Sequence, residues 1–157
     1  MFQFFKKKKE TIHAPCSGQV IPITEVKDPV FSQKLLGDGF AIIPNGEKIT
    51  APFAGQVLAI FPTKHAISFK TDSGIDYLIH IGIDTVKLQG APFSIFVKEN
   101  DKIKPGDLIA KVDFSQIIKA EKDPTVITVF TEENQIRQLN INNKIIKNKD
   151  YCGEIII

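Results

Sequence analysis

The sequence predicts an all-β protein, a single-domain antiparallel β-sandwich or flattened barrel with one or two short helices. Short runs rich in Ile and Val are separated at close intervals by turn-forming sequences such as Asn45-Gly46, Asp72-Ser73-Gly74 and Pro105-Gly106-Asp107. Many short strands with regular turns are typical of sandwiches and barrels. The 157 residues, 43% of them apolar, are enough for one domain with a substantial core and leave little room for a second.

We expect a basic N-terminal arm over residues 1–11 and the domain proper over residues 12–157. The arm places Phe2, Phe4 and Phe5 before four lysines, residues 6–9. This composition favours at most weak peripheral contact with an anionic membrane surface, and a solvated arm is the simpler interpretation. The charges follow the apolar residues and no long apolar stretch comes after them, so the arm does not resemble a signal peptide. A cytoplasmic location is therefore expected.

The cysteines and the charge exclude some functions. In the expected compartment Cys16 and Cys152 would be free thiols, because cytosolic disulfides are rare, and neither has the paired spacing of a zinc site. The formal net charge is only +2, and Arg137 is the single arginine. Proteins dedicated to nucleic-acid binding usually concentrate more positive charge than this, so no nucleic-acid partner is expected.

Two similar segments indicate a sheet with related halves. Residues 14–20 (APCSGQV) resemble residues 51–57 (APFAGQV), and each predicts a turn that leads into a strand, since proline cannot donate a ladder hydrogen bond and glycine tolerates positive φ. Further along, residues 115–121 and 131–139 could each form a short helix, the second with Thr131 as its N-cap. The final residues 154–157 predict a buried strand.

Residues 63–70 and 75–81 predict a β-hairpin that carries two of the three histidines. A loop of two or four residues makes the numbers of facing residues add up to 145, which places His65 directly opposite His80, with Ile67 facing Leu78 and Phe69 facing Asp76. A three-residue loop would shift the register and separate the histidines. An apolar surround and a second histidine both favour neutral imidazole, whose free lone pair can act as nucleophile or metal ligand.

The segments around these histidines resemble the glucose-family enzyme IIA of the bacterial sugar phosphotransferase system. The resemblance rests on Thr63-Lys64-His65-Ala66 and on residues 78–86 (LIHIGIDTV), with further matches at residues 28–31, 34–39 and 51–55. It implies an all-β domain that is a phosphotransferase and needs no cofactor. His80 would accept a phosphoryl group from the phosphocarrier HPr and pass it to a cysteine of enzyme IIB during sugar uptake.

The resemblance also implies the supporting residues and the docking face. His65 would hydrogen-bond the phosphoryl group, Thr63 would orient His65, and His13, which the motif lacks, would be structural. Regulatory proteins could be further partners, and His65 and His80 could share a zinc ion with a partner's ligand, although transfer itself requires no metal. The partner-binding residues would be Asp28, Val30, Phe31, Leu35, Leu36, Phe61, Ile81, Asp84 and Val86.

Two other functions are weighed against this one. A zinc hydrolase of the related duplicated-β type would need a His-x-His pair, but Leu78 and Gly82 flank His80 at that spacing, so the usual three protein ligands are missing. The second alternative function is that of a non-catalytic binding or regulatory module. Residues 98–111 have the turn pattern of biotinyl and lipoyl domains, yet Lys102 and Lys104 flank the turn rather than occupy its tip.

Overall fold

The computed structural model describes residues 8–132 and 134–157 and contains mainly short strands. The helices are α1 (Pro29–Ser32), α2 (Phe114–Lys119) and the 3-10 turns η1 (Ile23–Glu25) and η2 (Thr85–Leu88). The strands are β1 (Lys9–His13), β2 (Gly18–Pro22), β3 (Asp38–Pro44), β4 (Lys48–Thr50), β5 (Gly55–Ile60), β6 (Ala66–Thr71), β7 (Asp76–Ile83), β8 (Phe93–Ile95), β9 (Lys102–Ile103), β10 (Leu108–Val112), β11 (Asp123–Phe130), β12 (Gln138–Ile141), β13 (Ile145–Ile146) and β14 (Tyr151–Ile156).

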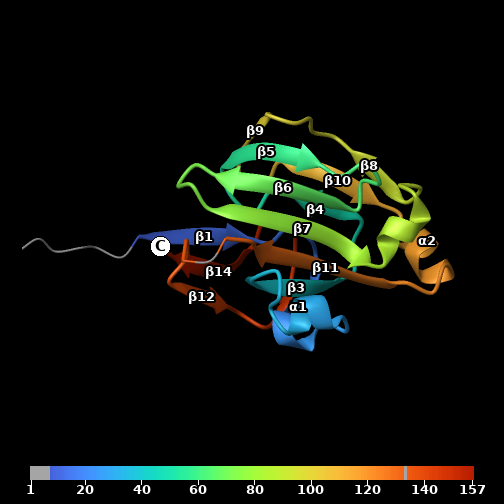
Figure 1. Cartoon of the computed structure of the whole chain (residues 1–157), viewed down its shortest axis with the longest axis horizontal. Helices are drawn as coiled ribbons and strands as arrows, with labels where there is room; N and C mark the ends of the chain where they lie inside the picture. Colours follow the sequence, from blue (N-terminus) through green and yellow to red (C-terminus); the bar gives the residue numbers. More distant parts are fainter. Residues whose placement is uncertain (1–7, 133) are drawn as a thin grey trace, which may run out of the picture.

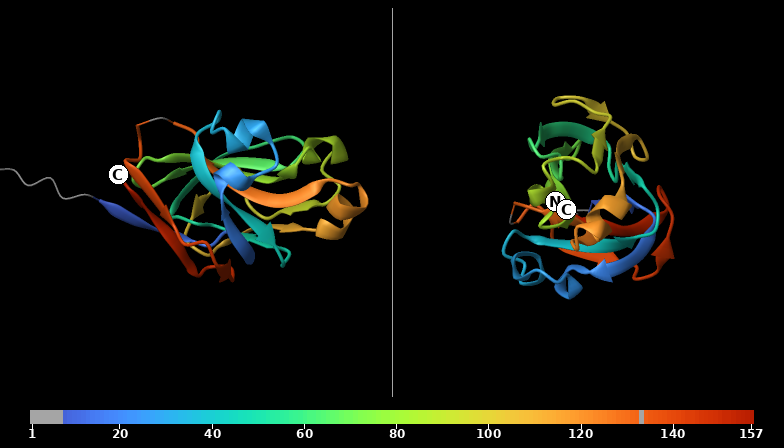
Figure 2. Two further views of the ribbon diagram at one scale, coloured as in Figure 1. Left: turned by 90° about the horizontal axis from the view of Figure 1, so that it is seen from below. Right: turned by 90° about the vertical axis from the view of Figure 1, so that its right-hand side faces the viewer.

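Three antiparallel sheets enclose the core (Figure 1). The largest has the order β13-β2-β3-β11-β7-β6-β5-β9, and two three-stranded sheets have the orders β1-β14-β12 and β4-β10-β8. Seen end-on, the strands curve around the interior as the wall of a flattened barrel (Figure 2). The predicted fold class is therefore confirmed. None of the helices in the described ranges is long and apolar enough to cross a membrane.

The large sheet buries apolar residues on both of its faces. Its inner face contributes to the main core together with residues of the two small sheets, such as Ile12 of β1 and Ile109 of β10. A second, smaller core lies on the outer face, where Phe31 of α1 packs with Ile83 and Ile127. The segment that contains η1 and α1 lies along β3 at this outer face (Figure 1). This second core matters for function because it surrounds part of the candidate site.

Only one of the two predicted helices forms. The helix expected at residues 115–121 is present as α2, whose N-cap Asp113 accepts a hydrogen bond from the Ser115 amide. The prediction of a helix at residues 131–139 is wrong. The described residues of this segment are irregular up to the start of β12, where Gln138 and Leu139 pair with β14. Helix α1 was not predicted, although Asp28 followed by Pro29 is a sequence signal for a helix start.

The boundary predicted for the N-terminal arm lies too far along the chain. Strand β1 begins at Lys9, and Glu10 and Thr11 pair with Ile155 and Glu154 of β14, so residues 9–11 belong to the domain. The phenylalanines and first two lysines of the arm lie outside the described residues. The final strand was predicted correctly, and β14 starts earlier than expected, at Tyr151.

The repeated segments form equivalent turns into β2 and β5. Their glycines, Gly18 and Gly55, are the first residues of these strands. A Cβ atom on Gly18 would lie 2.0 Å from the Ile43 carbonyl oxygen, and one on Gly55 would lie 2.1 Å from that of Lys70. Both glycines are therefore required by the close approach of the neighbouring strand. Cys16 and Cys152 are free thiols buried in the main core.

Candidate functional site

The two histidines meet, but not through the register that the sequence suggested. In the β6–β7 ladder Ala66 lies opposite His80, and Phe69 lies opposite Tyr77. The predicted pairs of His65 with His80, Ile67 with Leu78 and Phe69 with Asp76 are therefore wrong. The reason is a three-residue turn over residues 72–74, closed by a hydrogen bond from the Thr71 amide to the Ile75 carbonyl. Such a turn shifts the register by one residue.

His65 reaches His80 because residues 61–64 form a turn and residues 63–65 are not part of a strand. Lys64 has φ +60°, and its amide donates a hydrogen bond to the Phe61 carbonyl (2.7 Å). This turn redirects the chain just before β6 begins. The rings of His65 and His80 lie 5.0 Å apart between centroids, at an interplanar angle of 78°. The juxtaposition that the sequence predicted is present, although its predicted cause was wrong.

His80 lies on the outer face of β7, and one of its ring nitrogens is fixed by the backbone. Ile79 and Ile81 belong to the main core, so the intervening residue faces the opposite side of the sheet. The Nδ1 atom of His80 lies 2.7 Å from the Gly82 carbonyl oxygen. A carbonyl can only accept, so Nδ1 carries the proton and donates it. Nε2 of the neutral ring then keeps its lone pair, as a nucleophile requires.

His65 is held from two sides. Its Nδ1 atom lies 2.5 Å from the Thr63 hydroxyl, and the ring of Phe61 packs against its imidazole with an edge-to-face geometry (centroid distance 5.5 Å). The residue is only 7% exposed. Because Nδ1 is occupied by Thr63, Nε2 is the nitrogen available to a group bound between the two rings.

The surroundings keep both imidazoles neutral. Burial lowers the pKa of His65. Burial, followed by the effect of His65, lowers the pKa of His80 to about 4, although the hydrogen bond to Gly82 and the carboxylates of Asp28 and Asp84 act in the opposite direction. The desolvation cost of a charged ring exceeds the attraction of these acids. At neutral pH the site therefore presents two uncharged imidazoles.

Helix α1 covers one side of His80. The ring of Phe31 lies 5.1 Å from the His80 ring between centroids, and Phe31 is 5% exposed. Asp28 caps this short helix by accepting a hydrogen bond from the Val30 amide (2.9 Å). The cap thus places a carboxylate near the imidazole and, through α1, an aromatic ring against it. Of the features found at the site, the Gly82 carbonyl and the left-handed Lys64 were not identified from the sequence.

Most of the apolar residues expected to bind partners are exposed, as a docking surface requires. Leu35 is 68% exposed. Ile81 is an exception, because it is fully buried in the main core, and the expectation that it contacts a partner is wrong. Phe31 is also buried, and its ring packs against that of His80. We call the remaining exposed apolar set the docking face; its members are Val30, Leu35, Leu36, Phe61 and Val86.

The two histidines do not form a complete metal site on their own. Within residues 8–132 and 134–157 no group of three or more His, Cys, Asp or Glu side chains is placed to hold a metal ion. The described structure thus offers a zinc ion fewer protein ligands than the three or four that are usual. A metal shared by His65 and His80 would need a further ligand from another molecule.

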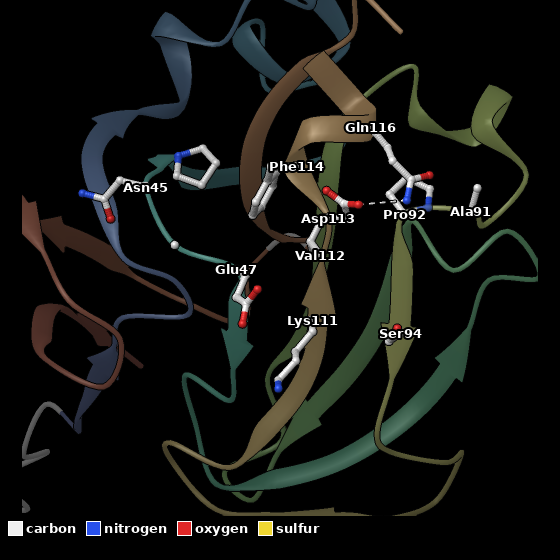
Figure 3. Close-up of a pocket in the computed structure, with 12 residues that line it drawn as sticks. Asn45, Glu47, Ala91, Pro92, Ser94, Lys111, Val112, Asp113, Phe114 and Gln116 are labelled. Atoms are coloured by element: carbon white, nitrogen blue, oxygen red, sulfur yellow. Dashed lines mark hydrogen bonds between the residues drawn. The ribbon is translucent and has the colours of Figure 1, made fainter. Parts of the chain in front are cut away.

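A separate surface pocket of about 580 Å³ lies beside α2 (Figure 3). Glu47, Lys111 and Asp113 line it, and no histidine is among its lining residues in the described part of the chain. The Asp113 carboxylate is occupied in capping α2, since it accepts hydrogen bonds from Ser115 and Gln116. This carboxylate therefore serves the local structure, and the histidine pair remains the candidate site.

The chain is similar to known proteins along most of its length. Residues 10–136 match a family described as phosphoenolpyruvate-dependent sugar phosphotransferase system, EIIA 1. The glucose-specific EIICBA component of Streptococcus pneumoniae is 42% identical over 87% of this chain and 19% of its own. The corresponding component of Staphylococcus saprophyticus is 47% identical over 93% of this chain and 21% of its own.

A similar fold is found among solved structures. Glucose permease IIA from Mycoplasma capricolum superimposes with a TM-score of 0.85 at 34% identity, covering 97% of this chain and 99% of that one. The two EIICBA relatives are much longer, and this chain spans about a fifth of their length. The similarity therefore concerns one domain of those proteins and includes the whole histidine site.

Proposed function

The chain belongs to the EIIA 1 family of the phosphoenolpyruvate-dependent sugar phosphotransferase system, and we propose that His80 is the residue that carries the phosphoryl group. Domains of this family are phosphotransferase components that act with HPr and an enzyme IIB domain. The observation that carries the proposal is the hydrogen bond from His80 Nδ1 to the Gly82 carbonyl. This hydrogen bond leaves Nε2 unprotonated, on the other side of the ring from the Gly82 carbonyl.

In the first step, Nε2 of His80 attacks the phosphorus atom of a phosphohistidine on HPr. A bond forms between Nε2 and phosphorus while the bond between phosphorus and the donor nitrogen breaks, and the donor ring leaves with that electron pair. The positive charge that leaves the donor ring appears on the ring of His80, which keeps its Nδ1 proton. The Gly82 carbonyl and the carboxylates of Asp28 and Asp84 favour that charge. Positioning and electrostatics then supply most of the catalysis.

In the second step, the thiolate of an enzyme IIB cysteine attacks the same phosphorus atom. The bond to Nε2 breaks, the electron pair returns to Nε2, and the ring of His80 becomes neutral again. The neutral state is the one that its buried surroundings favour. The low proton affinity of the His80 ring thus favours release of the phosphoryl group, and before transfer it keeps the lone pair of Nε2 available for attack.

His65 and Thr63 support both steps. In this proposal the Thr63 hydroxyl donates to His65 Nδ1, so that Nε2 carries the proton and can donate to a phosphoryl oxygen bound at His80. With ring centroids 5.0 Å apart, a group on His80 lies within reach of this donor. A neutral N–H stabilises the oxygens as charge shifts and, unlike an arginine, does not hold them in a tight ionic pair.

The docking face is the surface that would receive both partners, because it is apolar and exposed, Phe61 packs against His65, and Val30 lies on the helix whose Phe31 packs against His80. Asp28 and Asp84 at its edge would attract basic residues of HPr. The two relatives and the similar structure are named for glucose, so glucose is the sugar we propose for the transport system. A cognate enzyme IIB that is specific for another sugar, phosphorylated faster than a glucose-specific one, would contradict this assignment.

Incubation with phosphorylated HPr tests the assignment of His80. Intact mass spectrometry should show one added phosphoryl group, and peptide mapping under conditions that preserve phosphohistidine should place it on His80. A His80→Gln variant should remain unmodified, while His13→Gln should be modified as the wild type is. Label on His65 or His13, or none on any residue, would overturn the proposal. Unimpaired labelling of another residue would favour a different nucleophile within the same fold.

A further inference from the structure

Thr85 holds the end of strand β7 through a hydrogen bond to the backbone. Its hydroxyl donates to the Ile81 carbonyl oxygen at 2.5 Å. Thr85 is fully buried, and burial makes a hydrogen bond of this kind costly to lose. This hydrogen bond goes to the backbone rather than to a histidine ring, so Thr85 takes no direct part in the proposed transfer steps.

The residue that Thr85 holds also connects the two histidines. The Ile81 amide donates a hydrogen bond to the His65 carbonyl oxygen (2.7 Å), so the backbone of Ile81 is fixed at both its amide and its carbonyl. The next carbonyl along the chain is that of Gly82, which accepts the Nδ1 proton of His80. A shift of this short segment would therefore alter the position of both imidazoles.

Gly82 bends the strand between these contacts. It has φ +78°, and a Cβ atom at this position would lie 2.4 Å from Thr85 Cγ2. Across the ladder, Ile81 pairs with Val126 and Ile83 pairs with Asp123, so β11 has a bulge opposite this bend. As a result Ile81 packs in the main core and Ile83 in the second core, although residues two apart normally share a face.

From this geometry we infer that Thr85 is a positioning residue, which fixes the Ile81–Gly82 backbone so that the Gly82 carbonyl holds His80 with its proton on Nδ1. The inference rests on the proposed role of His80. Without the Thr85 hydroxyl, the peptide between Ile81 and Gly82 loses the contact that sets its orientation. The Gly82 carbonyl then no longer faces Nδ1 continuously, and the tautomer with the proton on Nε2, which cannot attack phosphorus, becomes populated.

Three variants separate positioning from stability. Thr85→Val removes the hydroxyl and keeps the shape, whereas Thr85→Ser keeps the hydroxyl. Thr128→Val is the matched control: Thr128 is a buried threonine of β11, and its hydroxyl has no hydrogen-bond partner within the described ranges. Its neighbours Val126 and Phe130 lie in the main core, so its side chain faces away from His80. If Thr85→Val does not fold, Thr85→Ala replaces it.

Nitrogen NMR of labelled protein at neutral pH reports the tautomer of His80 directly. We expect wild type, Thr85→Ser and Thr128→Val to show a protonated Nδ1, and Thr85→Val to show a mixture of tautomers. The single-turnover rate of phosphorylation by saturating phospho-HPr should fall roughly tenfold in Thr85→Val and remain near the wild-type rate in the other two. Thermal unfolding of each variant establishes that the measurement is made on folded protein.

The outcomes distinguish this inference from the proposed function. If wild-type protein is phosphorylated on His80 but folded Thr85→Val keeps the wild-type tautomer and rate, Thr85 is purely structural and the inference is overturned. An equal loss of rate in Thr85→Ser would also overturn it, because that variant retains the hydroxyl. If wild-type protein is not phosphorylated on His80, the proposed function fails, and the tautomer comparison still decides whether Thr85 positions the ring.

Discussion

The ring of His65 lies 5.0 Å from that of His80 and nearly perpendicular to it, although neither residue is the ladder partner of the other. Ala66 occupies the position opposite His80, and His65 extends toward it from the preceding turn. One imidazole is fixed by a backbone carbonyl and the other by a threonine hydroxyl. Two neutral rings of similar chemistry therefore have different hydrogen-bond partners, which fits the two roles proposed for them, the nucleophile and its hydrogen-bonding partner.

Replacement of His65 by glutamine should separate acceptance from transfer. His65→Gln leaves the Nδ1 contact of His80 intact, so HPr should still phosphorylate His80. The variant lacks the imidazole that would stabilise charge on the phosphoryl oxygens as the bond to His80 breaks, and transfer to enzyme IIB should fall by about 100-fold or more. Isolated phosphorylated variant mixed with enzyme IIB in a quenched-flow assay measures this step. Full transfer activity would refute the role of His65.

Replacement of Thr63 should affect the same step more weakly. Thr63→Val removes the hydroxyl that fixes Nδ1 of His65, so this ring can rotate or change tautomer. We expect transfer to enzyme IIB to slow roughly tenfold, whereas Thr63→Ser should retain most of the rate. The nitrogen NMR spectrum of His65 should change in Thr63→Val alone. A serine variant as slow as the valine variant would indicate that the methyl group, rather than the hydroxyl, is important.

Stability should depend on pH through His80. Its pKa is about 4 in the folded protein and about 6.5 in an unfolded chain, so between these values the unfolded state binds the additional proton. The stabilisation associated with neutral His80 is therefore complete above about pH 6.5 and is lost progressively as the pH falls toward 4.

Urea unfolding of wild type and His80→Gln measures this contribution. Between about pH 7 and pH 4.5 the wild type should lose about 2 kcal/mol more unfolding free energy than the variant, because glutamine does not titrate. Between pH 7 and pH 8 the unfolding free energies of the two proteins should change by equal amounts, because His80 is neutral in both the folded and the unfolded state there. Parallel pH profiles down to pH 4.5 would show that the pKa of His80 is not lowered.

Removal of one apolar side chain from the docking face should weaken partner binding without unfolding the domain. Leu35 is 68% exposed, so Leu35→Ser should change the thermal midpoint little, yet it should lower kcat/KM for phospho-HPr roughly tenfold. Ile145 of β13 is 75% exposed and lies outside the docking face, which makes Ile145→Ser the matched control. Equal kinetics in both variants would contradict the assignment of this surface to HPr.

Much of the site could be predicted from the sequence because its information is local. The run from His80 to Val86 and the segment from Thr63 to Ala66 identify the family, and the family supplies the nucleophile and its neighbours. The turn-rich, Ile- and Val-rich pattern predicts the fold class, since alternating burial is a property of each strand by itself. The N-terminal boundary and the second helix were predicted less accurately, because pairing with β14 overrode local preferences at residues 9–11 and 138–139.

The sequence by itself determined the all-β class, the family and the choice of His80 and His65 as the candidate site residues. Only the tertiary structure decided how these histidines meet, because register depends on the length of a turn, and a change of one residue there moves every facing pair. It also decided that Ile81 is buried while Leu35 is exposed, since burial depends on which other segments cover a face. The bend at Gly82, held by Thr85, exists through contacts between strands and could not be inferred from either residue alone.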